Sequence, residues 1–155
     1  MICALLRPAP FILFINPMEI QMSQFTWDNK YSVGSEELDN HHKKLFALFN
    51  KLDESCLDKD SRITLGPIVD ELVSYFTYHL VAEEQYMRNI GYKDIDKHIL
   101  EHKIFIDSIS KQQQKLDIND TVVTNEFIVY LGKWLTEHVM IEDKKYSREA
   151  YRVRT

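Results

Sequence analysis

Five of the six histidines in this 155-residue chain fall into a pattern that could bind metal. His79 and Glu83 are four residues apart, and so are His98 and His102. On an α-helix, residues at i and i+4 lie on one face, one turn apart, so each pair presents two ligands together. The two pairs converge on one point if their helices pack antiparallel. Three further candidates lie outside these pairs: His42, His138 and Asp143.

The elements that must position these residues are predicted to be helices. Glycine and proline are scarce, with four of each. Apolar residues recur with a helical period over four ranges: 36–56, 64–90, 94–115 and 122–146. Because short polar links at 57–62 and 116–121 force neighbouring helices to run antiparallel, we predict an all-α, up-down-up-down four-helix bundle. The charged tail 147–155 is expected to fray.

The N-terminal region divides into two parts. Residues 25–34 predict an extended arm that leads into the first helix, and residues 25–155 are expected to form one domain. Residues 1–24 are expected to be a poorly ordered extension, and Met18 or Met22 could be the natural start. The apolar run Phe11–Ile15 is shorter than the roughly 7–15 residues of a secretory signal core and far shorter than a membrane helix. An unrecognised anchor or address is the alternative.

Composition excludes several classes of function. The formal net charge is −5, with no basic cluster, so we predict neither nucleic-acid binding nor attachment to an anionic membrane. Cys3 and Cys56 form no motif, and two cysteines in a chain of this length do not make a disulfide framework. A reducing cytoplasm is therefore the expected location.

Each predicted helix carries a candidate ligand on its apolar stripe. In the first helix, His42 lies in line with Leu38 and Phe49, whereas His41 is about 100° away and is predicted to face solvent. In the fourth helix, the stripe includes Ile141. Buried histidines and carboxylates are costly unless they are paired or bind metal, so the pattern predicts a metal site. One metal-free alternative is a helical interaction bundle.

Seven ligands are too many for one ion and fit two ions that share two carboxylates. Nitrogen and oxygen ligands without thiolate suit iron, zinc, manganese or copper. Asp143 is the weakest member, because an i+5 spacing lies about 140° from His138 on a regular helix. It needs a local distortion or a helix end, and spacing alone does not favour it over Glu137 or Glu142.

The order and spacing of these residues resemble the hemerythrin family, in particular its bacterial single-domain members, the bacteriohemerythrins. The resemblance covers roughly residues 25–147, and its motifs are Trp27-x-x-x-Tyr31-x-Val33-Gly34, Leu38-Asp39-x-x-His42-x-x-Leu45-Phe46, Glu83-Glu84-x-x-Met87 and Trp134-Leu135-x-x-His138. The departures are Leu80, where phenylalanine is usual, His41 and the N-terminal extension. None of them removes a ligand.

This resemblance implies a non-haem di-iron centre with a solvent-derived bridge between two iron ions. One iron would be held by His98, His102 and His138. The other would be held by His42 and His79 and would have an open position for dioxygen. Glu83 and Asp143 would bridge the two. The implied function is reversible dioxygen binding for storage, delivery or sensing, without enzymatic activity; the alternative is a di-iron enzyme, namely a peroxidase, nitric-oxide reductase or oxidase.

Two further expectations complete this interpretation. The wall of the oxygen pocket is predicted from the residues on the ligand-bearing faces: Leu45, Phe49, Trp134 and Leu135. The expected partners are dioxygen and an oxygen-using enzyme, with the chain as a monomer or small homo-oligomer. The absence of a Glu-x-x-His pair on two helices distinguishes the site from those of carboxylate-rich di-iron oxygenases.

Overall fold

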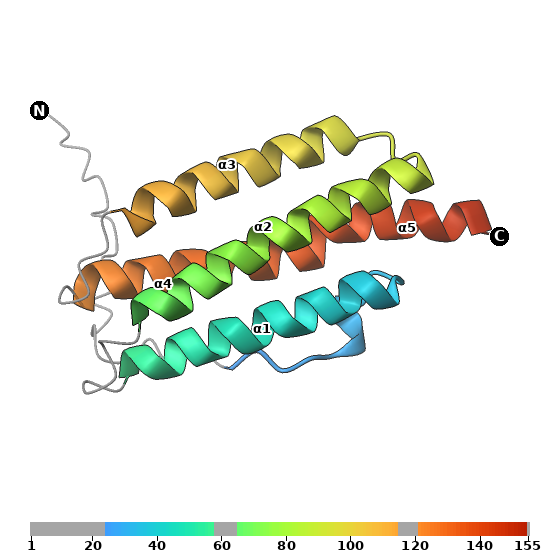
Figure 1. Ribbon diagram of the computed structural model, residues 1–155. Coiled ribbons are helices and arrows are strands. Elements are labelled where there is room, and N and C mark those ends of the chain that lie inside the picture. The colour runs from blue at the N-terminus through green and yellow to red at the C-terminus, as the bar shows by residue number, and fades with distance from the viewer. Residues whose placement is uncertain (1–23, 58–64, 115–120, 155) are drawn as a thin grey trace, which may run out of the picture.

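The computed structural model describes residues 24–57, 65–114 and 121–154, and these residues form helices and contain no strand. The elements, in chain order, are η1 (Asn29–Tyr31), α1 (Glu36–Leu57), α2 (Leu65–Ile90), α3 (Ile95–Gln113), α4 (Thr121–Glu137), η3 (His138–Glu142) and α5 (Asp143–Arg154). Successive long helices run in opposite directions, and α4, η3 and α5 together form the fourth rod (Figure 1). The predicted antiparallel four-helix bundle is confirmed.

The helix termini follow from their local sequences. Ser35 begins α1: its carbonyl accepts from the Asp39 N–H at 2.8 Å, and its hydroxyl lies 3.5 Å from the Leu38 nitrogen. Gly91 ends α2 in the left-handed region, with φ +68°. This conformation lets the Tyr92 N–H donate to the Met87 carbonyl at 3.0 Å, which closes the helix end.

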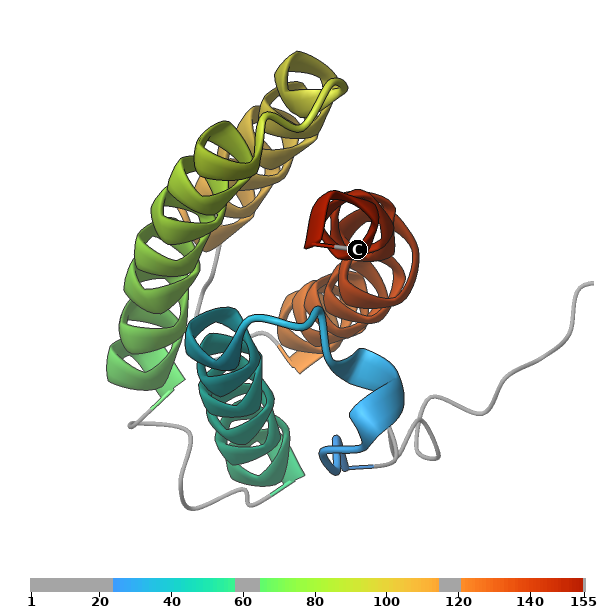
Figure 2. The same cartoon turned by 90° about the vertical axis from the view of Figure 1, so that its right-hand side faces the viewer.

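The predicted arm lies beside α1 (Figure 2). Phe25 is held by Asn50, which accepts from its N–H at 2.8 Å and donates to its carbonyl at 2.9 Å. The Phe25 ring stacks on Phe46 with centroids 4.9 Å apart. At the other end of the arm, Asp39 accepts from the Val33 N–H at 2.8 Å. The arm therefore covers one side of α1.

Buried polar residues divide the core into two apolar clusters. The larger cluster includes Leu45, Phe76, Phe105 and Leu135 and fills the end of the bundle where α1 finishes and α2 begins. The smaller cluster surrounds Tyr146 at the opposite end, with Val33, Leu38, Met87 and Tyr92. Between them, each of the four rods contributes at least one buried polar ligand candidate.

The fourth rod differs from its prediction as one regular helix with a frayed tail. A π-helical turn, η3, interrupts it at His138–Glu142, and α5 continues to Arg154. Ala150 is buried, so this part of the tail packs against the bundle. Ile141 was expected in the apolar stripe, but it lies in the π turn and is 55% exposed. Both the frayed tail and the burial of Ile141 were wrong predictions.

Two other predictions concern parts of the chain that are described incompletely. Residues 1–23 of the predicted extension lie outside the described residues, as do most of both polar links. Within the described helices, none is long and apolar enough to cross a membrane.

Candidate metal centre

Three histidines surround one oxygen of Glu83 and form what we call the three-histidine end of the cluster. The Nε2 atoms of His98 and His102 lie 3.5 Å and 3.2 Å from Glu83 Oε2. His138 Nε2 lies 3.6 Å from the same oxygen and 3.1 Å from His102 Nε2. These four buried residues bring one ligand atom each within 4.8 Å of one another. Such a group can enclose one metal ion.

A second group, the two-histidine end, shares Glu83 with the first. Its members are His42, His79 and Glu83, whose ligand atoms also lie within 4.8 Å of one another. The rings of His42 and His79 have centroids 4.7 Å apart. Glu83 therefore belongs to both groups, which is the position of a bridging carboxylate.

Asp143 also faces both ends. Its Oδ2 lies 3.3 Å from His42 Nε2, and its Oδ1 lies 3.1 Å from His138 Nε2 and 3.5 Å from His98 Nε2. The π turn explains how an i+5 residue reaches this place: the Asp143 N–H donates to the His138 carbonyl, which brings residue i+5 back over residue i. The local distortion that the spacing required is present.

The cluster contains more buried polar atoms than it can satisfy internally. Among the described residues, buried atoms without a hydrogen-bond partner include both ring nitrogens of His42, one nitrogen each of His79 and His98, Glu83 Oε2, and both carboxylate oxygens of Asp143. Unpaired buried polar groups are destabilising, and the cluster atoms named here belong to histidine and carboxylate side chains, which bind metal. The donor set, mixed imidazole and carboxylate, fits iron.

The protonation states of three histidines and of Glu83 also favour cation binding. Burial lowers the pKa of His42 and of His79, and burial lowers the pKa of His138 to about 4, so these rings are neutral and can offer a lone pair. Burial would raise the pKa of Glu83, but its close contacts with the rings of His102, His138 and His98 hold that pKa well below its ordinary value. Burial, followed by repulsion from Glu83, raises the pKa of Asp143. A cation between the two carboxylates would relieve that repulsion.

Sequence reasoning missed two residues that support the cluster. The buried Tyr146 hydroxyl donates to Glu83 Oε1 at 2.6 Å. Glu84 Oε1 lies 3.2 Å from His102 Nδ1 on the outer side of that ring. The available signals were the i+3 position of Tyr146 relative to Asp143 and the place of Glu84 beside a ligand.

His41 was predicted to face solvent, and this prediction is wrong. It is 8% exposed, because α1 and α2 pack closely and Tyr78 and Tyr75 cover it, with ring centroids 5.0 Å and 6.0 Å away. Its ring centroid lies 5.7 Å from that of His79. Burial lowers the pKa of His41, and its Nδ1 has no hydrogen-bond partner within residues 24–57, 65–114 and 121–154. It does not belong to either group of ligand atoms.

The four predicted wall residues lie in or against the larger apolar cluster. Leu45, Phe49 and Leu135 are at most 1% exposed, and Trp134 is partly buried. The Trp134 ring stacks on His138 with centroids 4.2 Å apart and an interplanar angle of 13°. Trp134 therefore contacts the three-histidine end.

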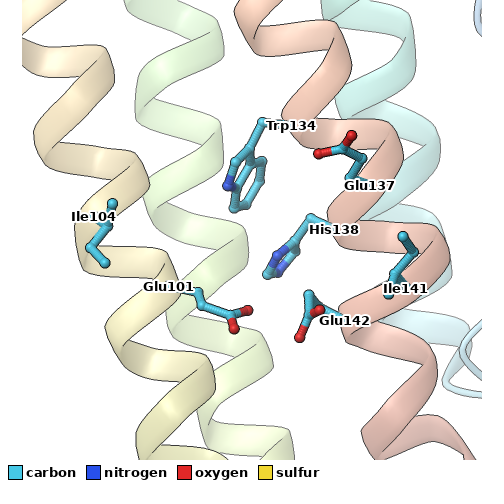
Figure 3. A pocket seen from close by; sticks show the side chains of 7 residues that line it. All are labelled: Glu101, Ile104, Trp134, Glu137, His138, Ile141 and Glu142. Carbon is cyan, nitrogen blue, oxygen red and sulfur yellow. The ribbon is translucent and has the colours of Figure 1, made fainter.

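A surface pocket of about 320 Å³ opens beside His138, between α3 and the fourth rod. Figure 3 shows Glu101 and Glu142 facing each other below the His138 ring, with Trp134 above it. Each of the three pocket carboxylates has a lysine partner: Glu101 with Lys97, Glu137 with Lys133, and Glu142 with Lys145. The pocket is therefore not an unpaired anionic site.

Fold and site together define a four-helix bundle protein with a buried histidine–carboxylate cluster of the kind that binds metal. The chain matches the Hemerythrin HHE cation binding domain over residues 33–150. It is 32% identical over 128 residues to a bacteriohemerythrin of Clostridium acetobutylicum, covering 79% of this chain and 98% of that protein. It is also 32% identical over 125 residues to a hemerythrin-like protein of Naegleria gruberi, covering 81% and 92%. The chain belongs to the hemerythrin family.

Solved structures give the same fold. A wild-type hemerythrin crystal structure superposes with a TM-score of 0.72 at 25% sequence identity and covers 83% of this chain and 98% of that one. The predicted family and fold are confirmed.

Proposed function

We propose that this protein binds dioxygen reversibly at a non-haem di-iron centre. The observation that carries the proposal is the division of five buried histidines into groups of three and two around shared carboxylates. An ion with three histidines has more of its coordination filled by protein than one with two. The unequal division leaves a place for an exogenous ligand at the two-histidine end.

The ligand set for the two iron ions follows from this division. His98, His102 and His138 would hold one ion, His42 and His79 the other, and the shared carboxylates of Glu83 and Asp143 would bridge them, with a solvent-derived bridge between the ions. A bound iron pair supplies the electrons that dioxygen takes up and returns. Five neutral imidazoles and two carboxylates keep the ligand charge low, which disfavours the high-valent states of oxygen-activating enzymes.

The apolar residues around the cluster would protect this chemistry from water. Leu45 and Phe49 follow His42 by one and two turns of α1, and Leu135 precedes His138 by one turn of the fourth rod. All three are almost fully buried. A dry wall excludes water and protons, which promote irreversible oxidation of ferrous iron. We assign these three residues to the pocket wall and Trp134 to the support of His138.

The experiment is a comparison of binding with turnover. An anaerobic sample loaded with ferrous iron is exposed to air and then degassed, and its visible spectrum is followed. The proposal predicts two irons per chain and a charge-transfer band that comes and goes. Steady-state assays with hydrogen peroxide and nitric oxide serve as the comparison, because sustained turnover would favour a di-iron enzyme. A cytoplasmic location, an oxygen-using partner enzyme and a monomer or small homo-oligomer stay predictions.

A further inference from the structure

We propose that Glu84 is a positioning residue that fixes the tautomer of His102 and sets the affinity and reduction potential of the iron that His102 binds. This proposal rests on the proposed metal centre. It concerns a carboxylate that belongs to neither group of ligand atoms and that contacts the outer nitrogen of the His102 ring.

The geometry carries the first step of the argument. Glu84 Oε1 lies 3.2 Å from His102 Nδ1, and Glu84 Oε2 accepts from Arg88 Nη2 at 3.2 Å. An ionised carboxylate only accepts hydrogen bonds, so the proton on His102 must sit on Nδ1. The Nε2 lone pair of His102 is then directed toward Glu83 Oε2, 3.2 Å away, where the ion would lie.

The second step is electrostatic. A carboxylate that accepts a hydrogen bond from the far nitrogen of a metal-binding histidine makes the ring more basic. A more basic ring binds the ion more tightly and stabilises ferric over ferrous iron. The Glu84 side chain is 20% exposed and His102 is 3% exposed, so solvent screens this interaction only in part.

The two ends of the cluster differ in this respect. At the two-histidine end, the Nδ1 atoms of His42 and His79 are buried and have no hydrogen-bond partner among the described residues. The three-histidine end therefore receives a charged outer partner through His102 that neither of these rings has. We infer that Glu84 makes the three-histidine ion the more firmly held of the two.

Arg88 contributes less than Glu84 to the proposed positioning of His102. It pairs with Glu84 one turn along α2, but its side chain is 51% exposed. Exposed ion pairs contribute little, so loss of Arg88 should leave Glu84 able to accept from His102. This difference separates the proposed role from a purely structural role of Glu84 as half of a surface ion pair.

The test measures metal affinity and reduction potential in four variants. Metal-free protein is titrated anaerobically with Co²⁺ against a chromophoric chelator, and the iron-loaded protein is titrated electrochemically. Glu84→Ala should weaken the tighter site by about 10–100-fold. Glu84→Gln retains an acceptor oxygen but loses the charge, so it should weaken binding less and raise the potential. Arg88→Met should change either quantity by less than about threefold.

Glu101→Gln is the matched control. Glu101 also lies near the cluster, in the pocket beside His138, and pairs with a lysine; among the described hydrogen bonds and ion pairs, none joins it to a ligand histidine. Unchanged affinity in Glu84→Ala together with an unchanged potential in Glu84→Gln would overturn the proposal, as would equal effects in Glu101→Gln. If the parent chain bound two metal ions but not dioxygen, the proposed function would fail, and the Glu84 proposal would be decided by the Co²⁺ titration alone.

Discussion

The two ends of the metal cluster are built differently. The three-histidine end is supported by polar and aromatic contacts: Glu84 lies against the outer side of His102, and Trp134 stacks on His138. At the two-histidine end, the Nδ1 atoms of His42 and His79 are buried and have no hydrogen-bond partner in the part of the chain that the structure describes. The difference indicates a division of labour. In the proposed di-iron centre, the supported end would hold its ion firmly, and the end with fewer protein ligands would leave space for dioxygen.

Removal of a residue that serves both ends should have the largest effect. Asp143 lies 3.3 Å from His42 and 3.1 Å from His138. We expect Asp143→Ala to lose both ions, with a loss of affinity greater than the ~10–100-fold that removal of an outer partner costs. Metal analysis of the purified protein checks this. Two irons per chain in this variant would show that Asp143 is not a bridge.

Removal of a ligand from one end of the cluster should leave one iron ion bound per chain instead of two. His79→Ala leaves a single histidine at the two-histidine end, so we expect one iron per chain and no dioxygen binding. Iron counting and the visible spectrum in air measure both. His102→Ala is the matched variant, because two histidines remain at its end. Reversible dioxygen binding by His79→Ala would contradict the assignment of the open position.

A substitution in the apolar wall should change the rate of irreversible iron oxidation and leave the metal ligands in place. Leu135→Ala opens a cavity one turn from His138, which should destabilise the protein by about 2–5 kcal/mol and accelerate irreversible oxidation by admitting water. Leu52 is equally buried but lies about 15 Å along α1 from His42. Leu52→Ala should cost similar stability without faster oxidation. Equal oxidation lifetimes for both variants would remove Leu135 from the pocket wall.

Acidification should destabilise the metal-free protein through its buried histidines. Burial lowers the pKa of His138 from 6.5 to about 4, so the unfolded chain binds this proton more readily than the folded protein does. Stability from this group is therefore complete above about pH 6.5 and falls as the pH decreases toward 4, by up to about 3 kcal/mol. His42 and His79 shift in the same direction. Because the raised pKa of Asp143 has the opposite effect, urea unfolding is measured at pH 7 and pH 5 in the Asp143→Asn variant, where equal stabilities would contradict the prediction.

The sequence predicted the site best where the helices are regular. His79 with Glu83 and His98 with His102 follow the i+4 rule, so their shared faces could be read directly. Asp143 could not be placed in this way, because a π turn depends on tertiary demands rather than on composition. The spacing showed only that a distortion or a helix end was needed. Ile141 lies in the same π turn and faces outward. The pattern of a regular helix could not indicate this exposure.

The remaining differences arise from contacts between elements. His41 looked exposed because only its own helix was considered, whereas two tyrosines of α2 cover it. Tyr146 of α5 reaches the cluster by a hydrogen bond to Glu83 of α2, and Glu84 of α2 reaches it by a hydrogen bond with His102 of α3. Periodicity within one helix assigns a residue to a face, but it does not identify the residue that meets it from the next helix.

The most direct test of the account is the visible spectrum of the anaerobic ferrous protein, with iron counted per chain, as air is admitted and removed. The account predicts two irons per chain and a charge-transfer band that appears with dioxygen and disappears when it is withdrawn. Two irons with an irreversible change would contradict reversible binding and favour an oxidase or peroxidase. A chain that takes up no iron, or only zinc, would contradict the di-iron centre itself.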